Sequence, residues 1–483
     1  MAVERKTFSK DLIHLGIMII IIAFFWLSKP FGQALPPVGM KVLGVFIAGC
    51  YGWTTAGTFW PSILCMCLLP FTGAATMAEV LAQGPGNNMF LFIMFMLVFN
   101  QLLDDAGVNV TIANWFISRK IVSGRPWLLI FLLLTAGYLM ATVCNVFLCL
   151  FLMWSLVYGI CKGVGYQQHD KLPTILVIAV LFCIMMGYLT MPFHGMTVIL
   201  LGAFAKMAGL TVPFATYLGF SIPVGFGSVI ITFLTVRFLV RPDVAKLTSY
   251  DINSVDPENI KFTKYKLIIL GSLIFFVVSL LIAGMLPKTN PFAVVVNTLG
   301  NSGLIALIMM VLLFVKVEGE PLYDFQKTAA KGLSFDILMC TMYMLALGTF
   351  VSSEKTGING FFMEIFSPIL GGLSPVVFCI VIGLICVFLT NFLSNIAVAY
   401  MFLPLAVSFG PVIGFPPLAL AMVIIYAAHI AIVTPAASIY AAIMHSNSEW
   451  VTPKEATLYA LLIVVCVSIV TIPLGVLLAF ALN

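Results

Sequence analysis

The sequence predicts an all-α polytopic membrane protein. Of its 483 residues, 62% are hydrophobic and 8% are charged, which is too little polar surface for a soluble body of this size. The apolar residues form continuous runs near the ~20 residues that cross a bilayer as a helix, without the alternation of a membrane β-barrel. The length allows about eleven transmembrane helices plus two re-entrant hairpins. Soluble proteins and outer-membrane barrels are excluded.

Single crossings account for most of the apolar segments. Residues 1–27 begin with basic side chains but carry no small-residue cleavage site before Lys29-Pro30, so we expect a retained first helix rather than a signal peptide. Continuous apolar character predicts single crossings at residues 12–27, 38–54, 59–70, 89–103, 214–236, 267–286, 292–315, 335–351 and 457–481.

Two segments are apolar at both ends and polar in the middle. Residues 127–158 are interrupted at 142–145, and residues 374–408 are interrupted at Thr390, Asn391, Ser394 and Asn395. Backbone that leaves the helix at membrane depth has to be buried in protein or line a wet cavity. Both segments are therefore predicted to be re-entrant hairpins.

Two further segments are too long for one ordinary crossing and carry a proline near the middle. These are Thr190-Met191-Pro192 within residues 172–207 and Thr434-Pro435 within residues 416–445. Because proline removes a helical hydrogen bond, both segments are predicted to be helices broken halfway.

The basic residues assign the two sides of the membrane. With a cytoplasmic N-terminus, 18 of the 23 Lys and Arg fall inside, among them Arg125, Lys162, Lys171, Arg237, Arg241, Lys246 and Lys454. The other five, Lys29, Lys41, Lys206, Lys288 and Lys355, fall outside. We expect a multi-pass protein of the plasma (inner) membrane with its C-terminus outside.

The longest polar connection is expected to be a cytoplasmic linker at 241–266, between two halves of the chain. The 11 Cys lie mostly in apolar runs without the spacing of a disulfide framework or a zinc site. No nucleic-acid partner and no organic cofactor are implied.

An internal repeat relates the two hairpins. Gly107 and Asn145 are 38 residues apart, as are Gly357 and Asn395, so an offset of 250 pairs Asn145 with Asn395. By the predicted topology the first hairpin enters from the cytoplasm and the second from outside. Inverted repeats with paired broken helices are typical of secondary transporters, whose site lies at the midplane between the repeats.

The second hairpin also resembles a known family. The segment Thr390-Asn391-Phe392-Leu393-Ser394-Asn395-Ile396, the later Leu403-Pro404, the earlier Lys355-Thr356-Gly357 and the Thr434-Pro435 break resemble the divalent anion/sodium symporters of the ion transporter superfamily. The resemblance covers most of the chain. It implies a homodimer in which each protomer has scaffold helices, here at 1–103 and 267–351, and an elevator-like transport part, here at 104–240 and 352–483. The family carries di- and tricarboxylates or sulfate by sodium symport or by exchange.

This sequence departs from the Ser-Asn-Thr motif of that family. Cys144-Asn145-Val146 stands in the first hairpin, and Ile396 replaces the threonine of the second, so three hydroxyls are missing. By resemblance and position, the expected substrate-binding residues are Cys144, Asn145, Ser394 and Asn395, with Thr190, His194, Thr434 and Pro435 at the broken helices. Sodium would be held by Thr390, Asn395 and Asn145.

Amides and helix ends can bind an anion without a basic residue in the membrane. An asparagine side chain offers both a donor and an acceptor, and the N-terminus of a half-helix adds backbone N–H groups and the positive end of its dipole. The alternative is that each Asn only caps a helix. Thr190, Thr434 and Ser438 would likewise either contact the substrate or bond carbonyls freed by proline.

Two histidines lie at the predicted broken helices. Both His194 and His429 are functional-site candidates because an ionisable group is costly inside the membrane. His194 would ligate an anion when protonated or carry a coupling proton. For both residues the alternative is a neutral ring bonded to a backbone carbonyl. Asp104, Asp105 and Glu354 fall at the membrane edge and are expected to be solvated.

Three classes of function follow, led by a secondary transporter of a small organic anion. An inorganic anion such as sulfate is the alternative substrate. An intramembrane enzyme using His194, His429 and Cys144 is disfavoured because no nucleophile–base spacing is present. A channel or a non-transporting receptor is the third class.

Overall fold

The chain is helical throughout almost all of the part that can be described. The computed structural model describes residues 2–31, 34–108, 111–112, 115, 124–210, 212–249, 261–287, 289–351, 353–358, 360–362, 364 and 372–483. Among these residues, the one sheet is a hairpin of β1 (Lys316–Val317) and β2 (Glu320–Pro321). Within the described part of the chain, nine helices are long and apolar enough to cross a membrane, or ten if one bent pair is a single span. The all-α polytopic fold class is confirmed.

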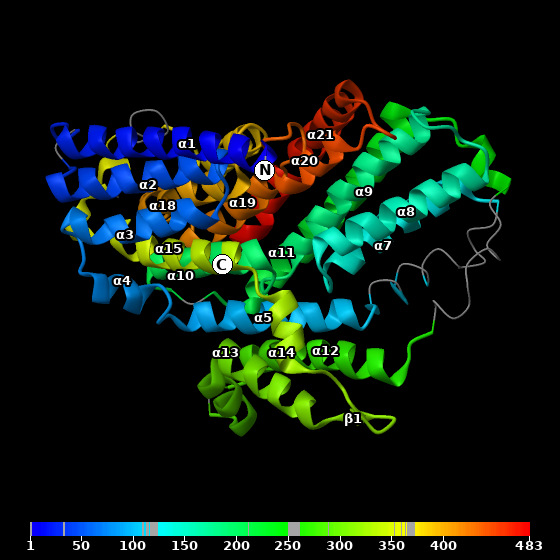
Figure 1. The fold of residues 1–483 in the computed structure, drawn as a ribbon, viewed down its shortest axis with the longest axis horizontal. Coiled ribbons are helices and arrows are strands. Elements are labelled where there is room, and N and C mark those ends of the chain that lie inside the picture. The colour runs from blue at the N-terminus through cyan, green and yellow to red at the C-terminus, as the bar shows by residue number, and fades with distance from the viewer. Residues whose placement is uncertain are drawn as a thin grey trace.

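One end of the molecule is a group of roughly parallel helices. It contains α1 (Ala2–Leu27), α2 (Pro37–Thr55), α3 (Phe59–Leu68) and α15 (Phe335–Val351), and short α4 (Met77–Gln83) lies beside it (Figure 1). The Tyr343 hydroxyl of α15 donates to the Val45 carbonyl of α2 at 3.0 Å. Elsewhere in the described residues, short turns of 3-10 or π helix lie at Leu69–Thr72, Thr235–Val240, Ala245–Ser249 and Glu354–Thr356.

A second group lies across α5 (Asn88–Asp105). It consists of α12 (Lys264–Met285), α13 (Pro291–Phe314) and α14 (Phe325–Gly332), all packed against α5 (Figure 1). The sequence predicted one simple crossing at 292–315, but α13 is broken at Gly300, where φ is 62°. Only glycine adopts this conformation readily, so the break follows from the residue itself.

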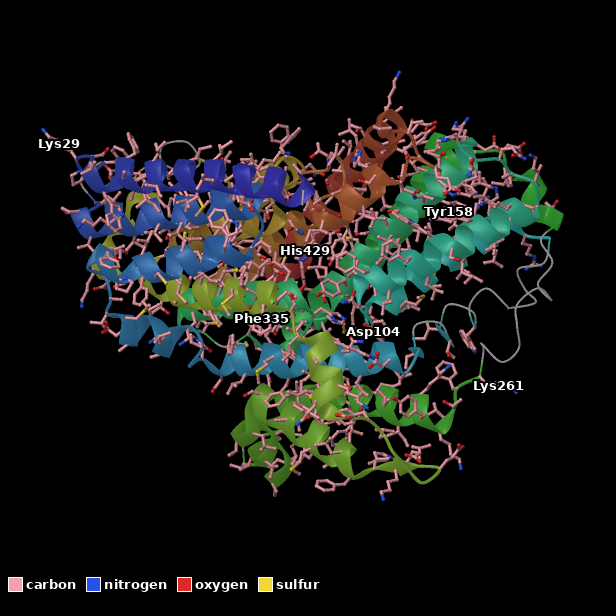
Figure 2. All side chains as sticks on the ribbon, in the orientation of Figure 1. Lys29, Asp104, Tyr158, Lys261, Phe335 and His429 are labelled. Atoms are coloured by element: carbon pink, nitrogen blue, oxygen red, sulfur yellow. The ribbon has the colours of Figure 1, made fainter. Side chains whose placement is uncertain are left out.

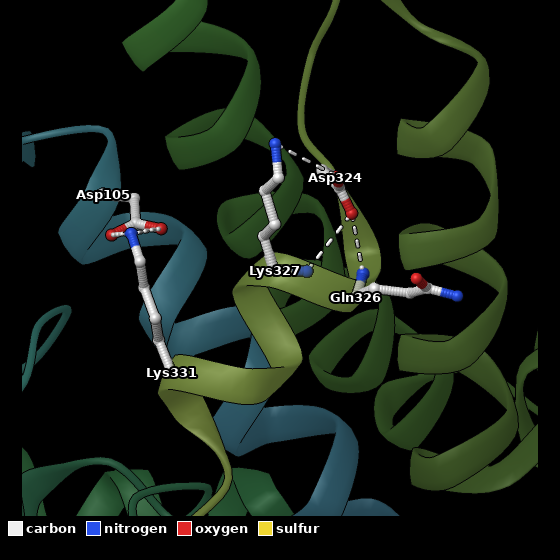
Figure 3. A network of polar contacts seen from close by, with 5 residues as sticks. All are labelled: Asp105, Asp324, Gln326, Lys327 and Lys331. Carbon is white, nitrogen blue, oxygen red and sulfur yellow. Dashed lines mark hydrogen bonds and ion pairs between the residues drawn. The ribbon is translucent and has the colours of Figure 1, made fainter.

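Helix α14 is a short element that the sequence analysis left in a connection. Its N-terminus is capped by Asp324, whose Oδ1 accepts from the backbone N–H groups of Gln326 and Lys327 at 3.0 and 3.2 Å. Lys331 Nζ lies 3.3 Å from Asp105 Oδ1 and so ties α14 to the end of α5 (Figure 3). Helices α14 and α15 meet at an angle of 72°.

The two predicted hairpins are interrupted where the sequence indicated. The first hairpin is α7 (Pro126–Ala141) and α8 (Val146–Gly163), and the second is α17 (Pro375–Thr390) and α18 (Asn395–Ile413). Each first arm has 16 residues. Such an arm is about 24 Å long, short of the ~30 Å hydrocarbon core. Entry and exit on one side of the membrane stay a prediction.

Both broken helices are present. The first broken helix is α9 (Lys171–Thr190) and α10 (Gly195–Ala208), and the second is α19 (Pro417–His429) and α20 (Ile439–Ser446). The two halves pack alike. Helix α7 contacts α9 and α11 (Phe214–Leu234), while α17 contacts α19 and α21 (Pro453–Ala481), and α11 packs against α21.

The structure shows which residues of the two halves correspond, and at the hairpins this alignment differs from the one expected from the sequence. Gly107 and Gly357, 250 residues apart, both have a left-handed φ, of 66° and 62°. The hairpin helices differ by one residue, because Asn145 is the N-cap of α8 and Ser394 is the N-cap of α18. The structural partner of Asn145 is therefore Ser394 rather than Asn395. Each of these glycines is followed two residues later by an asparagine, at positions 109 and 359, and both asparagines lie outside the described residues.

Candidate substrate site at the helix breaks

Asn391 joins the second hairpin to the second broken helix. Its Nδ2 donates to the carbonyls of Val387 and Ile430, both at 2.7 Å. Its Oδ1 accepts from the backbone N–H groups of Ile432 and Val433 at 3.0 and 2.9 Å. The side chain is only 4% exposed. One buried amide thus fixes two pieces of non-helical backbone, and the sequence analysis had placed it in the break without giving it a role.

The hydroxyls of this half bind backbone carbonyls. Thr390 Oγ1 donates to the Ala428 carbonyl at 2.7 Å, Thr434 Oγ1 to the Asn391 carbonyl at 2.6 Å and Ser438 Oγ to the Ala431 carbonyl at 2.9 Å. These contacts match the second of the two expected roles, in which the hydroxyls bond backbone carbonyls freed at the break and do not contact the substrate. Each oxygen keeps lone pairs for a cation or a donor. Pro435 is exposed.

Ser394 and Asn395 stand at the start of α18. Asn395 is 5% exposed, and its Oδ1 accepts from the Ile396 N–H at 3.0 Å. Its Nδ2 makes no hydrogen bond to any described residue. Ser394 is partly exposed, and its hydroxyl does not cap the helix. The second hairpin therefore offers an amide donor at a helix N-terminus.

Asn145 holds the equivalent place in the first hairpin. Its Oδ1 accepts from the Phe147 N–H at 2.9 Å, so it caps α8, and its exposed Nδ2 faces no described partner. Its own N–H donates to Oδ1 of Asp104, at the end of α5, at 3.3 Å. Cys144 is buried beside it. Asp104 was expected to be solvated, but it is partly buried against the hairpin (Figure 2).

His194 connects the first hairpin to the first broken helix. Its Nε2 donates to the Thr142 carbonyl at 2.9 Å, and Tyr188 stacks on the ring with centroids 4.6 Å apart. The side chain is fully buried, and Nδ1 has no partner among the described residues. His429 is similar, because Nδ1 donates to the Ile425 carbonyl at 2.7 Å and the buried Nε2 has no described partner (Figure 2).

Thr190 belongs to a buried polar cluster shared by three helices. Its Oγ1 lies 2.9 Å from the Tyr138 hydroxyl of α7 and donates to the Met186 carbonyl at 2.8 Å. Ser221 of α11 donates to the Thr190 carbonyl at 2.7 Å. Tyr138 and Ser221 were not foreseen, since neither interrupts an apolar run. The cluster fixes the end of α9.

The two halves meet near the breaks. The rings of Phe147 in α8 and Tyr440 in α20 lie 5.0 Å apart, and α10 packs against α18. No hydrogen bond among the described residues joins Asn145 to Ser394 or Asn395. The described residues contain no group of three or more His, Cys, Asp or Glu that would hold a metal ion.

The breaks themselves carry no charged residue, although the Asp104 carboxylate of α5 reaches the start of α8. Four helix N-termini, those of α8, α10, α18 and α20, begin at breaks that contain no Lys, Arg, Asp or Glu. Backbone N–H groups and the dipole at each helix start attract negative charge. Paired hairpins and broken helices in a polytopic helical protein are the architecture of a membrane transporter.

Comparison with known proteins gives the family. Residues 42–427 match a family model described as citrate transporter. The chain belongs to the citrate transporter family. No curated protein matches the chain. The narrower resemblance to the divalent anion/sodium symporters stays a prediction.

Two solved transporters share the fold. The YdaH transporter of Alcanivorax borkumensis is 15% identical, with a TM-score of 0.55 over 83% of this chain and 88% of that one. MtrF of Neisseria gonorrhoeae, described with a class of antimetabolite efflux pumps, is 13% identical, with a TM-score of 0.58 over 95% and 94%. At these identities the similarity concerns the fold alone. Membership of a transporter family fits the expectation of a protein that is not an enzyme.

Proposed function

We propose that this protein is a secondary active transporter of a small organic anion of the di- or tricarboxylate class. The observation that carries the proposal is the pair of hairpin breaks, each hydrogen-bonded to a broken helix and each opening on a helix N-terminus. Asn145 and Asn395 are the amide donors to the substrate, with Cys144 and Ser394 beside them. Thr190, His194, Thr434 and Pro435 belong to the adjoining breaks.

The uncharged character of the breaks supports carboxylate binding. A carboxylate accepts hydrogen bonds at two oxygens. Backbone N–H groups at a helix start can donate to it without a Lys or Arg having to be buried in the membrane. The citrate description of the family supports the same class of substrate.

Transport requires the site to face each side in turn. We include in the proposal an elevator movement of residues 104–240 and 352–483 against scaffold residues 1–103 and 267–351, within a homodimer in the plasma (inner) membrane. Coupling is by a cation or by exchange. Thr390, Asn395 and Asn145 are the side chains that would give oxygen ligands to sodium.

Uptake into liposomes tests the proposal directly. Purified protein should accumulate labelled citrate or a dicarboxylate when a sodium gradient, a proton gradient or an internal anion is supplied. Asn395→Ala should lower anion affinity by about 10-fold or more, because a hydrogen bond to a charged group is lost. Asn297→Ala, at an exposed site in α13, is the matched control and should bind normally.

Other outcomes would contradict it. Uptake of sulfate alone would identify an inorganic anion transporter. Ligand binding without uptake under any gradient would favour a receptor. If Asn395→Ala leaves binding of the ligand unchanged, the site lies elsewhere.

Asp104→Asn tests whether the start of α8 receives the anion. The Asp104 carboxylate accepts from the Asn145 N–H, so it competes with and repels an anion at that helix end. Its neutralisation should tighten substrate binding about fivefold, the effect of a charge of ~1 kcal/mol at a helix terminus. Binding is measured by thermal stabilisation against ligand concentration.

The neighbouring carboxylate is the control for that measurement. Asp105 lies against Lys331 and Gln101, away from the hairpin, so Asp105→Asn should leave the affinity unchanged. Equal effects of the two variants would indicate a general electrostatic change. Unchanged affinity in Asp104→Asn would place the anion at another helix end.

A further inference from the structure

Exposed basic residues gather at the end of the molecule where α8 and α11 finish and where α7, α9 and α21 begin. These elements pack on one another and on the turns Thr235–Val240 and Ala245–Ser249. Among the described residues, the exposed cations at this end are Arg125, Lys162, Lys171, Arg237, Arg241, Lys246 and Lys454. The acidic residues beside them are fewer: Asp170, Asp243, Glu449 and Glu455. We call this set of cations the basic face. Its residues are all on the predicted cytoplasmic side.

A turn of π helix at the end of α11 mixes cations with apolar side chains. The Arg241 N–H donates to the Val236 carbonyl at 3.0 Å, which closes the turn, and Arg241 has a left-handed φ of 50°. Phe238 and Leu239, which stand between Arg237 and Arg241, are 53% and 58% exposed. Guanidinium groups beside exposed apolar side chains are suited to the boundary between hydrocarbon and headgroups.

Aromatic rings and carbonyls hold the cations in place. The Arg237 guanidinium lies 5.5 Å from the Trp127 ring centre and 5.3 Å from that of Phe238. Arg241 Nε donates to the Phe238 carbonyl at 2.6 Å. Neither arginine forms an ion pair with a described carboxylate, whereas Lys162 lies 3.9 Å from Glu449. The two guanidinium groups are positioned and keep donors for an oxyanion.

We propose that the basic face binds the headgroups of anionic phospholipids. A lipid phosphate is held by Arg237 and Arg241, while Phe238 and Leu239 extend toward the acyl chains. Arginine suits this role because its planar donors match phosphate oxygens in pairs. The excess of cations adds attraction to an anionic leaflet. The interaction anchors the base of the first hairpin to one side of the membrane.

Lipid titration of the purified full-length protein tests the proposal. Phosphatidylglycerol or phosphatidylcholine is added to protein in detergent, and the thermal midpoint is followed against lipid concentration. Phosphatidylglycerol should raise the midpoint more than phosphatidylcholine. Arg237→Gln/Arg241→Gln should weaken its apparent affinity about 25-fold, since each cation near an anionic surface contributes about fivefold.

A variant at the opposite end is the matched control. Lys29→Gln/Lys355→Gln removes two exposed cations from the other predicted side, and Lys29 lies far from Tyr158 at the base of α8 (Figure 2). This variant should respond to phosphatidylglycerol like the wild type. Equal weakening in both double variants, or none in the arginine variant, would overturn the proposal. So would a full shift with inorganic phosphate alone, which would identify a free anion as the ligand.

Discussion

Asn391→Ala is expected to abolish anion uptake and to lower the thermal midpoint sharply. The side chain supplies four hydrogen bonds to backbone groups of Val387, Ile430, Ile432 and Val433. Alanine leaves those buried backbone groups unsatisfied. At about 1–3 kcal/mol for each unsatisfied group, the free energy of unfolding should fall by on the order of 5 kcal/mol. Thermal unfolding in detergent and uptake into liposomes measure the two effects.

Smaller changes at the same junction separate its components. Asn391→Asp replaces the donor with a carboxylate oxygen that faces the Val387 and Ile430 carbonyls, so its midpoint should fall at least as far as that of Asn391→Ala. Thr434→Ala removes only the hydroxyl bond to the Asn391 carbonyl and should cost about 1 kcal/mol. If Asn391→Ala is as stable and active as Asn297→Ala, the amide does not hold the two breaks together.

The sequence predicted the breaks because they depend on local chemistry. Proline at 192 and 435 removes a helical hydrogen bond in the middle of an over-long apolar segment, and Asn145 and Ser394 favour N-caps, so the interruptions are visible as residue types. The fold class likewise follows from apolar runs. These features need no knowledge of which helix packs on which.

The missing features depend on contacts between distant segments. Asn391 makes hydrogen bonds to residues about 40 positions later in the chain. Asp104 accepts a hydrogen bond from a hairpin that starts at Pro126. The register of the repeat was misjudged by one residue because Asn145 and Asn395 look alike, although only the first is an N-cap. Residue identity records local preference, whereas the backbone decides which atom meets which partner.

Gly187→Ala, at the close contact of α7 and α9, is expected to have the second large effect on stability and uptake, because this contact sets the geometry of the first hairpin. A Cβ at Gly187 would lie 2.0 Å from the Tyr138 carbonyl oxygen, so the helices touch there backbone to backbone. Gly187→Ala must push them apart. The Tyr138–Thr190 and His194–Thr142 contacts both cross this interface. We expect the free energy of unfolding to fall by about 3 kcal/mol, seen as a lower thermal midpoint, and we expect uptake to be lost.

Gly159→Ala provides the matched control within the same hairpin. No heavy atom lies within 4 Å of a Cβ built at Gly159 in α8, so alanine fits there without displacement. That variant should retain uptake and a midpoint equal to or above that of the wild type, because alanine is the better helix former. Anion affinity gives the functional measure. If Gly187→Ala folds normally but binds the anion more weakly, the spacing of α7 and α9 acts on the site itself. Normal stability together with normal uptake would contradict the close contact of the two helices.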